Sequence, residues 1–329
     1  MPVQLRGPAV TVSVRPMSRL RRLSRPSLAL ASRRFAPGLA LLGALGLGSL
    51  VACEKTPDAD TNTPSTPGAA GGTVMRYKVA PSRLKETIKV SFGISGGGGT
   101  GEIKVDATGL LDISDAGNGK LKIGRSVVEV RELEMTGALK PKPKEGEPLP
   151  DFKAELLAGK GASIIDALGN EDKGASAALP ENAKKKDDAK SEFSGFMDFL
   201  GLPSDLPAEG LAEGTPWKTK KEEPAGKGPM AVDMESDLTY TLVKIDASSG
   251  KRLAELKIEA EASGATEMSQ GGQSMMISVD ATTESTIVFN LDDQIPVSYH
   301  LAITQVGTYG QRGSGELRIS IDATYEPAT

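Results

Sequence analysis

The 329-residue sequence contains one cysteine, Cys53, and one histidine, His300. A single cysteine excludes a disulfide bond within the chain and any cysteine-rich metal site. A single histidine excludes most histidine-based metal sites and leaves one candidate for histidine-dependent catalysis. The chain does contain 38 glycines and 21 prolines, and these residues indicate many turns and loops.

Acidic residues are absent from the first 53 positions, which carry eight arginines and no lysine. The remaining 276 residues hold 31 basic and 43 acidic side chains, a net charge of −12. This balance excludes a mature protein that binds nucleic acid through a basic surface.

The N-terminal region has the order of an export signal. Residues 1–34 are arginine-rich, and an apolar run of mainly Leu, Ala and Gly extends from Phe35 to Ala52. The run is too short and too rich in glycine for a membrane-spanning helix. A basic stretch, an apolar stretch and then small residues are typical of a signal peptide, so we assign residues 1–52 to export.

The apolar run ends in Leu50-Val51-Ala52-Cys53, which resembles the lipobox of bacterial lipoproteins. In that family signal peptidase II cuts before the cysteine, whose thiol is diacylated and whose new amino group is usually acylated. The resemblance implies a lipid on Cys53 that anchors the chain to a membrane of the cell envelope, with the body in the periplasm or on the cell surface. The alternative is a buried cysteine in an uncleaved signal anchor.

Residues 53–73 follow as a lipid-anchored flexible tether. Positions 54–73 contain only polar, charged and small residues and proline. With no large apolar side chain, this stretch cannot join a hydrophobic core.

From Val74 onward the hydrophobic pattern has the period of two that is typical of β-strands. Leu84, Ile88 and Val90 alternate with polar residues, and Glu86 alone interrupts this apolar row. Similar alternation recurs in Ile103–Ala107 and from Leu121 onward, and it resumes after Trp217 to the end of the chain. We therefore predict a mainly β fold in which long antiparallel strands form a sheet that must curl or be covered on its apolar side.

Two local features refine this prediction. Asn118-Gly119 lies between two strand patterns and predicts a two-residue hairpin turn. The apolar positions then change from even numbers (Val128, Val130) to odd numbers (Leu133), which predicts a β-bulge near Arg131.

We assign residues 74–329 to a single β-rich domain with a disordered insertion at 171–190. The insertion lacks valine, isoleucine and aromatic residues, so its composition favours disorder.

Two stretches of the body, Gly161–Asn170 and Leu206–Trp217, resemble segments of a group of uncharacterised bacterial lipoproteins with large β domains. The first is a strand that runs into a glycine turn, and the second is a Leu-Pro opening followed by Gly-Thr-Pro-Trp. The resemblance implies a strongly curved antiparallel sheet, similar to the half-barrel of periplasmic lipoprotein carriers, with a short helical segment between two strand-rich halves.

No catalytic motif is supported by its sequence context. Gly96–Gly101 matches G-x-G-x-x-G, but a strand pattern follows it where the nucleotide-binding fingerprint requires a helix. Ser82–Lys85 matches S-x-x-K, but it starts a strand and lacks its companion motifs. His300 lies opposite an apolar row, and Glu259 and Glu261 lie on a solvated face. We therefore predict that the protein is not an enzyme and has no cofactor or metal.

Residues 191–202 predict the one short amphipathic helix of the fold. Four apolar residues share one stripe with helical spacing: Phe193, Phe196, Met197 and Leu200. The helix either plugs the core of the sheet or forms a lid or wall over an apolar cavity, and in the second case these four residues bind the ligand.

The sequence thus predicts a membrane-anchored exported lipoprotein that acts as a non-enzymatic binding module, with an apolar or lipid-like ligand in the curve of its sheet. The alternative is a structural or protein-interaction lipoprotein of the cell envelope that has no ligand cavity.

Overall fold

The computed structural model of the protein describes residues 72–78, 81–142, 149–183, 200–225, 232–270, 273–309 and 313–328. The expected export signal, Cys53 and tether residues 54–71 lie outside these ranges, as do Phe193, Phe196 and Met197.

Most of the described residues form strands. The strands are β1 (Ser82–Gly96), β2 (Gly101–Gly117), β3 (Lys120–Gly137), β4 (Lys160–Ile165), β5 (Pro216–Ala225), β6 (Val232–Asp246), β7 (Leu253–Gln270), β8 (Gln273–Asn290), β9 (Ile295–Tyr309) and β10 (Ser314–Pro327). Short helices are α2 (Phe152–Ala158), α3 (Lys173–Ala177) and α4 (Pro180–Ala183).

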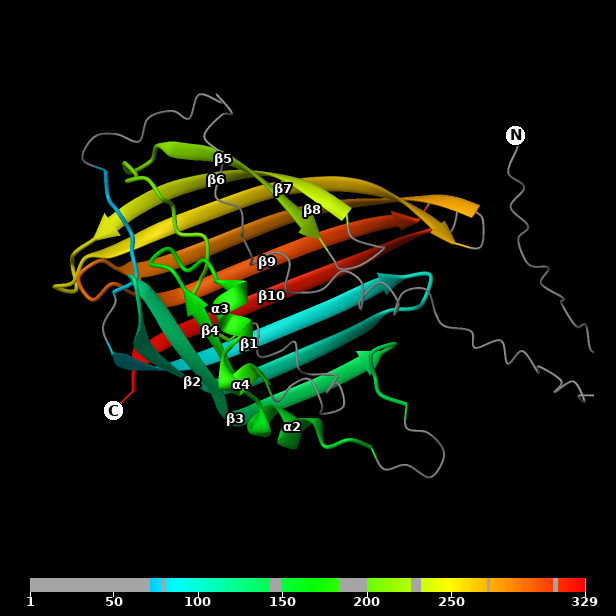
Figure 1. Ribbon diagram of the computed structural model, residues 1–329, viewed down its shortest axis with the longest axis horizontal. Helices are drawn as coiled ribbons and strands as arrows, with labels where there is room; N and C mark the ends of the chain where they lie inside the picture. The colour runs from blue at the N-terminus through cyan, green and yellow to red at the C-terminus, as the bar shows by residue number, and fades with distance from the viewer. Residues whose placement is uncertain are drawn as a thin grey trace, which may run out of the picture. The chain divides into compact units, whose positions relative to one another are not determined.

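All these strands belong to one antiparallel sheet in the order β4-β3-β2-β1-β10-β9-β8-β7-β6-β5. The pairing of β1 with β10 places the first and last strands side by side inside the sheet (Figure 1). The sheet therefore consists of two meanders joined at β1 and β10, with β4 and β5 at its edges. The predicted fold class, a mainly β protein built on a curved antiparallel sheet, is confirmed.

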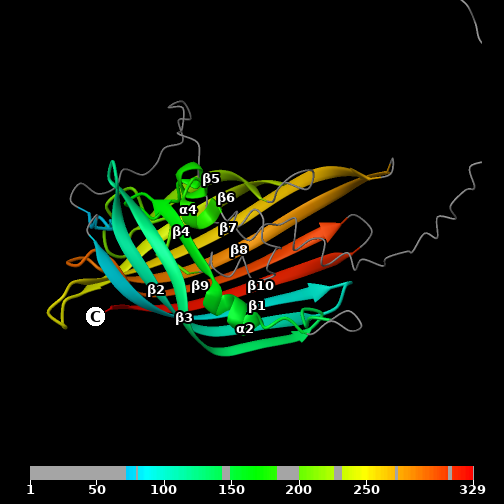
Figure 2. The same cartoon turned by 60° about the horizontal axis from the view of Figure 1, so that its bottom comes forward.

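Local sequence signals account for the turn and the bend of the β2–β3 hairpin. Asn118 and Gly119 have φ values of 56° and 74°, as a type I′ turn requires. The register of β2 with β3 then shifts so that Arg131 is skipped, and a second shift skips Val128. The predicted bulge at Arg131 is confirmed, and the hairpin curves strongly in this region (Figure 2).

Alternation along the strands places the core on one face of the sheet, which we call the inner face. Ile88 and Val90 on β1 lie opposite Ala323 and Ile321 on β10, and all four side chains are buried. The opposite, outer face carries the polar residues of the same strands.

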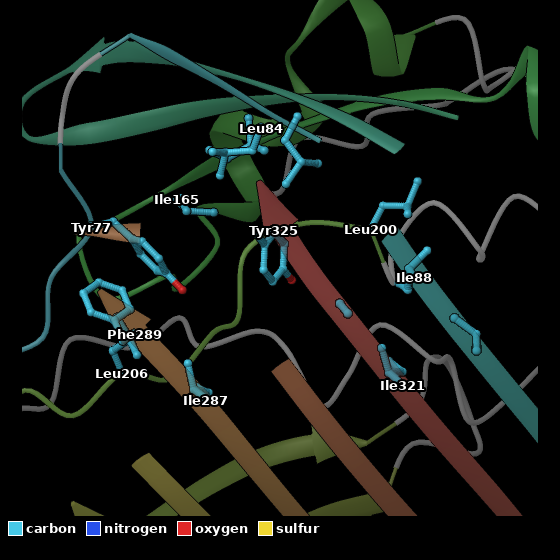
Figure 3. Close-up of a cluster of buried hydrophobic side chains, with 14 of the residues drawn as sticks. Tyr77, Leu84, Ile88, Ile165, Leu200, Leu206, Ile287, Phe289, Ile321 and Tyr325 are labelled. Atoms are coloured by element: carbon cyan, nitrogen blue, oxygen red, sulfur yellow. The ribbon is translucent and has the colours of Figure 1, made fainter. Parts of the chain in front are cut away.

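Two segments outside the sheet cover part of the inner face. One is residues 72–78, and the other is residues 200–211, which we call the strap. Thr73 and Leu211 join them through two backbone hydrogen bonds of 2.7 and 2.9 Å. Tyr77 packs edge-on against Phe289 of β8, with ring centroids 5.6 Å apart (Figure 3). The apolar side of the open sheet is therefore covered by irregular chain.

The expectation of disorder at 171–190 is wrong for residues 171–183, which form α3 and α4 beside β4. Polar contacts hold them in place. Ser176 Oγ accepts a hydrogen bond from Ile164 N at 2.8 Å, and the Asn182 amide donates to Ala162 O at 2.7 Å. Composition did not indicate this order, because the segment is attached to a strand edge by hydrogen bonds. Residues 184–190 lie outside the described residues.

Close strand contact at Gly264 of β7 generates a test of the packing. A Cβ at this position would lie 2.4 Å from Asp233 O and 2.8 Å from Met234 Sδ. We expect Gly264→Ala to lower the free energy of unfolding in urea by about 1–3 kcal/mol. The control is Gly93→Ala on β1, where the nearest atom is 4.0 Å away. Equal stability of the two variants would contradict the described packing of β6 on β7.

Candidate functional site

The inner face contains a buried polar cluster beneath the start of the strap. It consists of Glu86 on β1, Arg125 on β3, Ser163 on β4 and Tyr325 on β10, together with the backbone of Gly201. Glu86 has no solvent exposure, although it stands in the otherwise apolar row of β1. Burial of an ionisable group among apolar side chains is costly unless polar partners surround it.

The partners of the cluster are the peptide groups on either side of Gly201. The Tyr325 hydroxyl donates to Gly201 O at 2.8 Å, and Gly201 N donates to Glu86 Oε1 at 3.4 Å. Arg125 Nη2 donates to Ser163 Oγ at 2.5 Å. The cluster therefore offers the main chain at Gly201 one hydrogen-bond donor, the Tyr325 hydroxyl, and one acceptor, the Glu86 carboxyl.

Burial controls the protonation of this cluster. Loss of hydration raises the pKa of Glu86 to about 8, against the opposing effects of the Gly201 N–H, the Arg125 charge and the Tyr325 hydroxyl. Burial, followed by the negative charge of Glu86, raises the pKa of Tyr325 well above its ordinary value. At neutral pH the folded chain therefore holds both groups mainly in their neutral forms.

Further contacts recognise the backbone of the strap along its length. The Tyr77 hydroxyl donates to Pro203 O at 2.7 Å. Arg76 donates to Pro207 O at 2.9 Å and to Ala208 O at 2.6 Å. The strap is thus held through its carbonyl groups by side chains from outside it.

Main-chain and ionic contacts complete the attachment. Leu206 N donates to Leu168 O at 3.0 Å, and Asp205 forms an ion pair with Lys221 of β5. Gly169 lets the strap approach closely, because a Cβ there would lie 2.5 Å from Pro203 O.

Of the four residues predicted to line the ligand site, Leu200 is the one among the described residues. Its side chain is 1% exposed and belongs to the core of the inner face (Figure 3). The helix was predicted to end at Leu202, but residues 200–202 are not helical. Gly201, with φ +147°, adopts a backbone conformation that is unfavourable in a helix.

Glu86 is a site residue that the sequence pattern did not predict. It is the single polar residue in the apolar row of β1, and this interruption is the signal that could have identified it. Its partners were not recognisable, since Tyr325, Arg125 and Gly201 come from three other parts of the chain.

Side chains considered for catalysis lie on the outer face or in turns. His300 is exposed, and its Nδ1 lies 2.7 Å from Asp322 Oδ1. Glu259 and Glu261 are exposed, as predicted. Gly96–Gly101 connects β1 to β2 as a hairpin loop, also as predicted.

Within the part of the chain that the structure describes, no group of three or more His, Cys, Asp or Glu side chains is arranged to hold a metal ion. The same residues include no helix with the length and apolar character needed to cross a membrane.

Comparison with known proteins places the chain in no family. No family model and no curated protein matches it. Among solved structures it is similar to an outer membrane channel from Pseudomonas putida F1, with 12% identity and a TM-score of 0.17, over 83% of this chain and 100% of that one. A likeness with so low a TM-score supports no conclusion about fold or function.

The raised pKa of Glu86 generates a prediction about stability and pH. The folded chain keeps the proton up to about pH 8, whereas the unfolded chain releases it near the ordinary value of 4.5. The free energy of unfolding should therefore fall as pH rises through this interval, by about 4 kcal/mol between pH 5 and pH 8. Glu86→Gln should remove most of this decrease in urea titrations.

The matched control is Glu259→Gln, which changes an exposed glutamate on β7. This variant should keep the pH dependence of the unchanged chain. If Glu86→Gln keeps it as well, Glu86 does not hold a proton in the folded state.

Proposed function

We propose that the protein is an exported envelope lipoprotein whose β body is a non-enzymatic binding module for an apolar or lipid-like ligand. The observation that carries the proposal is the strap: a segment without regular structure lies on the apolar inner face and is attached there largely through its backbone. Movement of the strap exposes an apolar surface without breaking the sheet.

Anchoring of the module rests on the N-terminal sequence. A lipid on Cys53 attaches the chain to a membrane, because several acyl chains on one residue give firm binding. The expected tether ends before Gly72, because Thr73 is already hydrogen-bonded to Leu211, and residues 54–71 span roughly 60 Å when fully extended. The body can therefore work at a distance from the bilayer surface.

The inner face offers suitable chemistry for an apolar ligand. Leu84, Ile88 and Ile321 belong to the same apolar core as the leucines of the strap and are 0–3% exposed. Removing such side chains from water is favourable by about 1.5–3 kcal/mol each. Opening of the strap exposes these apolar side chains to water, and an apolar ligand that takes the place of the strap buries them again.

A second candidate function is structural or protein-interacting, without a ligand. It is favoured by the filling of the inner face, where Met75, Leu256 and Phe289 are fully buried by neighbouring side chains. The two functions differ in whether the strap ever leaves the sheet.

Substitution of Cys53 tests the anchor. We expect Cys53→Ser to abolish lipid attachment and to release the protein from the membrane fraction, since serine lacks the thiol that accepts the diacylglyceryl group. Cell fractionation and mass spectrometry of the mature N-terminus measure both effects. A Cys53→Ser protein that stays membrane-bound, with an N-terminus elsewhere than residue 53, would disprove lipid anchoring.

Binding of a fluorescent fatty acid tests the ligand site. We expect Leu206→Ala, which loosens the strap by truncating a buried side chain, to bind the probe at least several-fold more tightly than the unchanged chain. The control is Met234→Ala, in a separate apolar cluster of the sheet. Absence of binding by both the unchanged chain and Leu206→Ala would favour the structural alternative.

A further inference from the structure

We propose that the strap is an internal ligand, and that its site binds a peptide segment of another protein with the pattern Leu-Gly-x-Pro-x-x-Leu in the conformation of the strap. This inference rests on the proposed function, because it specifies the class of apolar ligand that the inner face binds. The pattern is that of the strap residues 200–206.

The site recognises successive peptide groups. Tyr325 donates to Gly201 O and Tyr77 to Pro203 O, while Leu206 N donates to Leu168 O. A peptide that adopts the conformation of the strap, with positive φ at the positions of Gly201 and Asp205, offers the same main-chain groups. Domains that bind extended peptides use main-chain hydrogen bonds for affinity and side-chain pockets for specificity.

Side-chain pockets along the strap supply that specificity. Leu200 and Leu206 are 1% and 3% exposed, and Pro203 between them is buried. Gly109 of β2 lies beside the first of these, since a Cβ there would be in ordinary contact with Leu200 Cδ2 at 3.5 Å. Two leucines and a proline at this spacing therefore fit the inner face.

Glycine is required at the second position of the pattern. A Cβ on Gly201 would lie 3.2 Å from Arg125 Nε, and its φ of +147° is one that other residues rarely adopt. A peptide with alanine in this place meets both the strained backbone conformation and the Arg125 guanidinium.

The distribution of polar groups favours a peptide over a lipid. Tyr325, Glu86, Tyr77 and the Leu168 carbonyl contact different peptide groups of the strap. A fatty acid has one polar head, so its apolar tail would leave several of these buried groups without a hydrogen bond.

The test uses a fluorescent synthetic peptide with the sequence of residues 200–208 and the full chain carrying Leu206→Ala. Because this substitution weakens the competing strap, fluorescence anisotropy should show binding at least ten-fold tighter than to the unchanged chain. A peptide with alanine in place of its glycine should bind at least ten-fold more weakly. These two results together support the proposal.

A second substitution distinguishes recognition by the site from loosening of the strap. In the Leu206→Ala background, Tyr325→Phe should weaken peptide binding several-fold, because the donor to the glycine carbonyl is lost. The control Thr108→Val removes a buried hydroxyl whose partner is Glu129 and should leave binding unchanged. Equal effects of both substitutions would overturn the proposal.

Hydrogen exchange on the unchanged chain keeps the test valid if Leu206→Ala does not fold. Excess peptide should accelerate exchange of the Gly201 and Leu206 amides, since displacement of the strap exposes both. Unaltered exchange at saturating peptide would overturn the proposal. If the fluorescent fatty acid binds and the peptide does not compete with it, the peptide proposal is overturned and the proposed binding function stands. If neither the fatty acid nor the peptide binds, both proposals are rejected.

Discussion

The open sheet presents one apolar face, and covering that face is the constraint on which the rest of the structure depends. Successive side chains of a strand point to opposite faces of the sheet, so the apolar residues at every second position all lie on the inner face. Segments 72–78 and 200–211 cover part of this face without forming regular strands of the sheet. Their peptide groups consequently need hydrogen-bond partners from side chains. Tyr77, Tyr325 and Glu86 supply such partners.

This mode of covering creates a difference in stability between the sheet and the strap. Ladders of hydrogen bonds join β1 to β10 and β2, and β10 to β9, without a register shift. The strap is attached by separate hydrogen bonds, each worth roughly 0.5–1.5 kcal/mol, and by a few buried apolar side chains. Local opening of the strap therefore costs less free energy than unfolding of the sheet. Binding through displacement is compatible with a sheet that stays intact.

The two edges of the sheet are treated differently. At β4, the Ser176 hydroxyl and the Asn182 amide bond to the backbone of the strand. The other edge strand, β5, contains Lys218, Lys220 and Pro224. Lysine and proline on an edge strand both oppose pairing with another strand. Both arrangements oppose pairing of the sheet edges with a further strand.

The sequence by itself determined the features that depend on neighbouring residues. Period-two alternation predicted the strands, Asn118-Gly119 predicted a type of turn that needs two positive φ angles, and the change of phase predicted the bulge at Arg131. Only the tertiary structure decided the pairing of β1 with β10, the order of residues 171–183 and the burial of Glu86 beneath Gly201. These features depend on hydrogen bonds between residues far apart in the chain, and local periodicity contains no information about which distant groups meet.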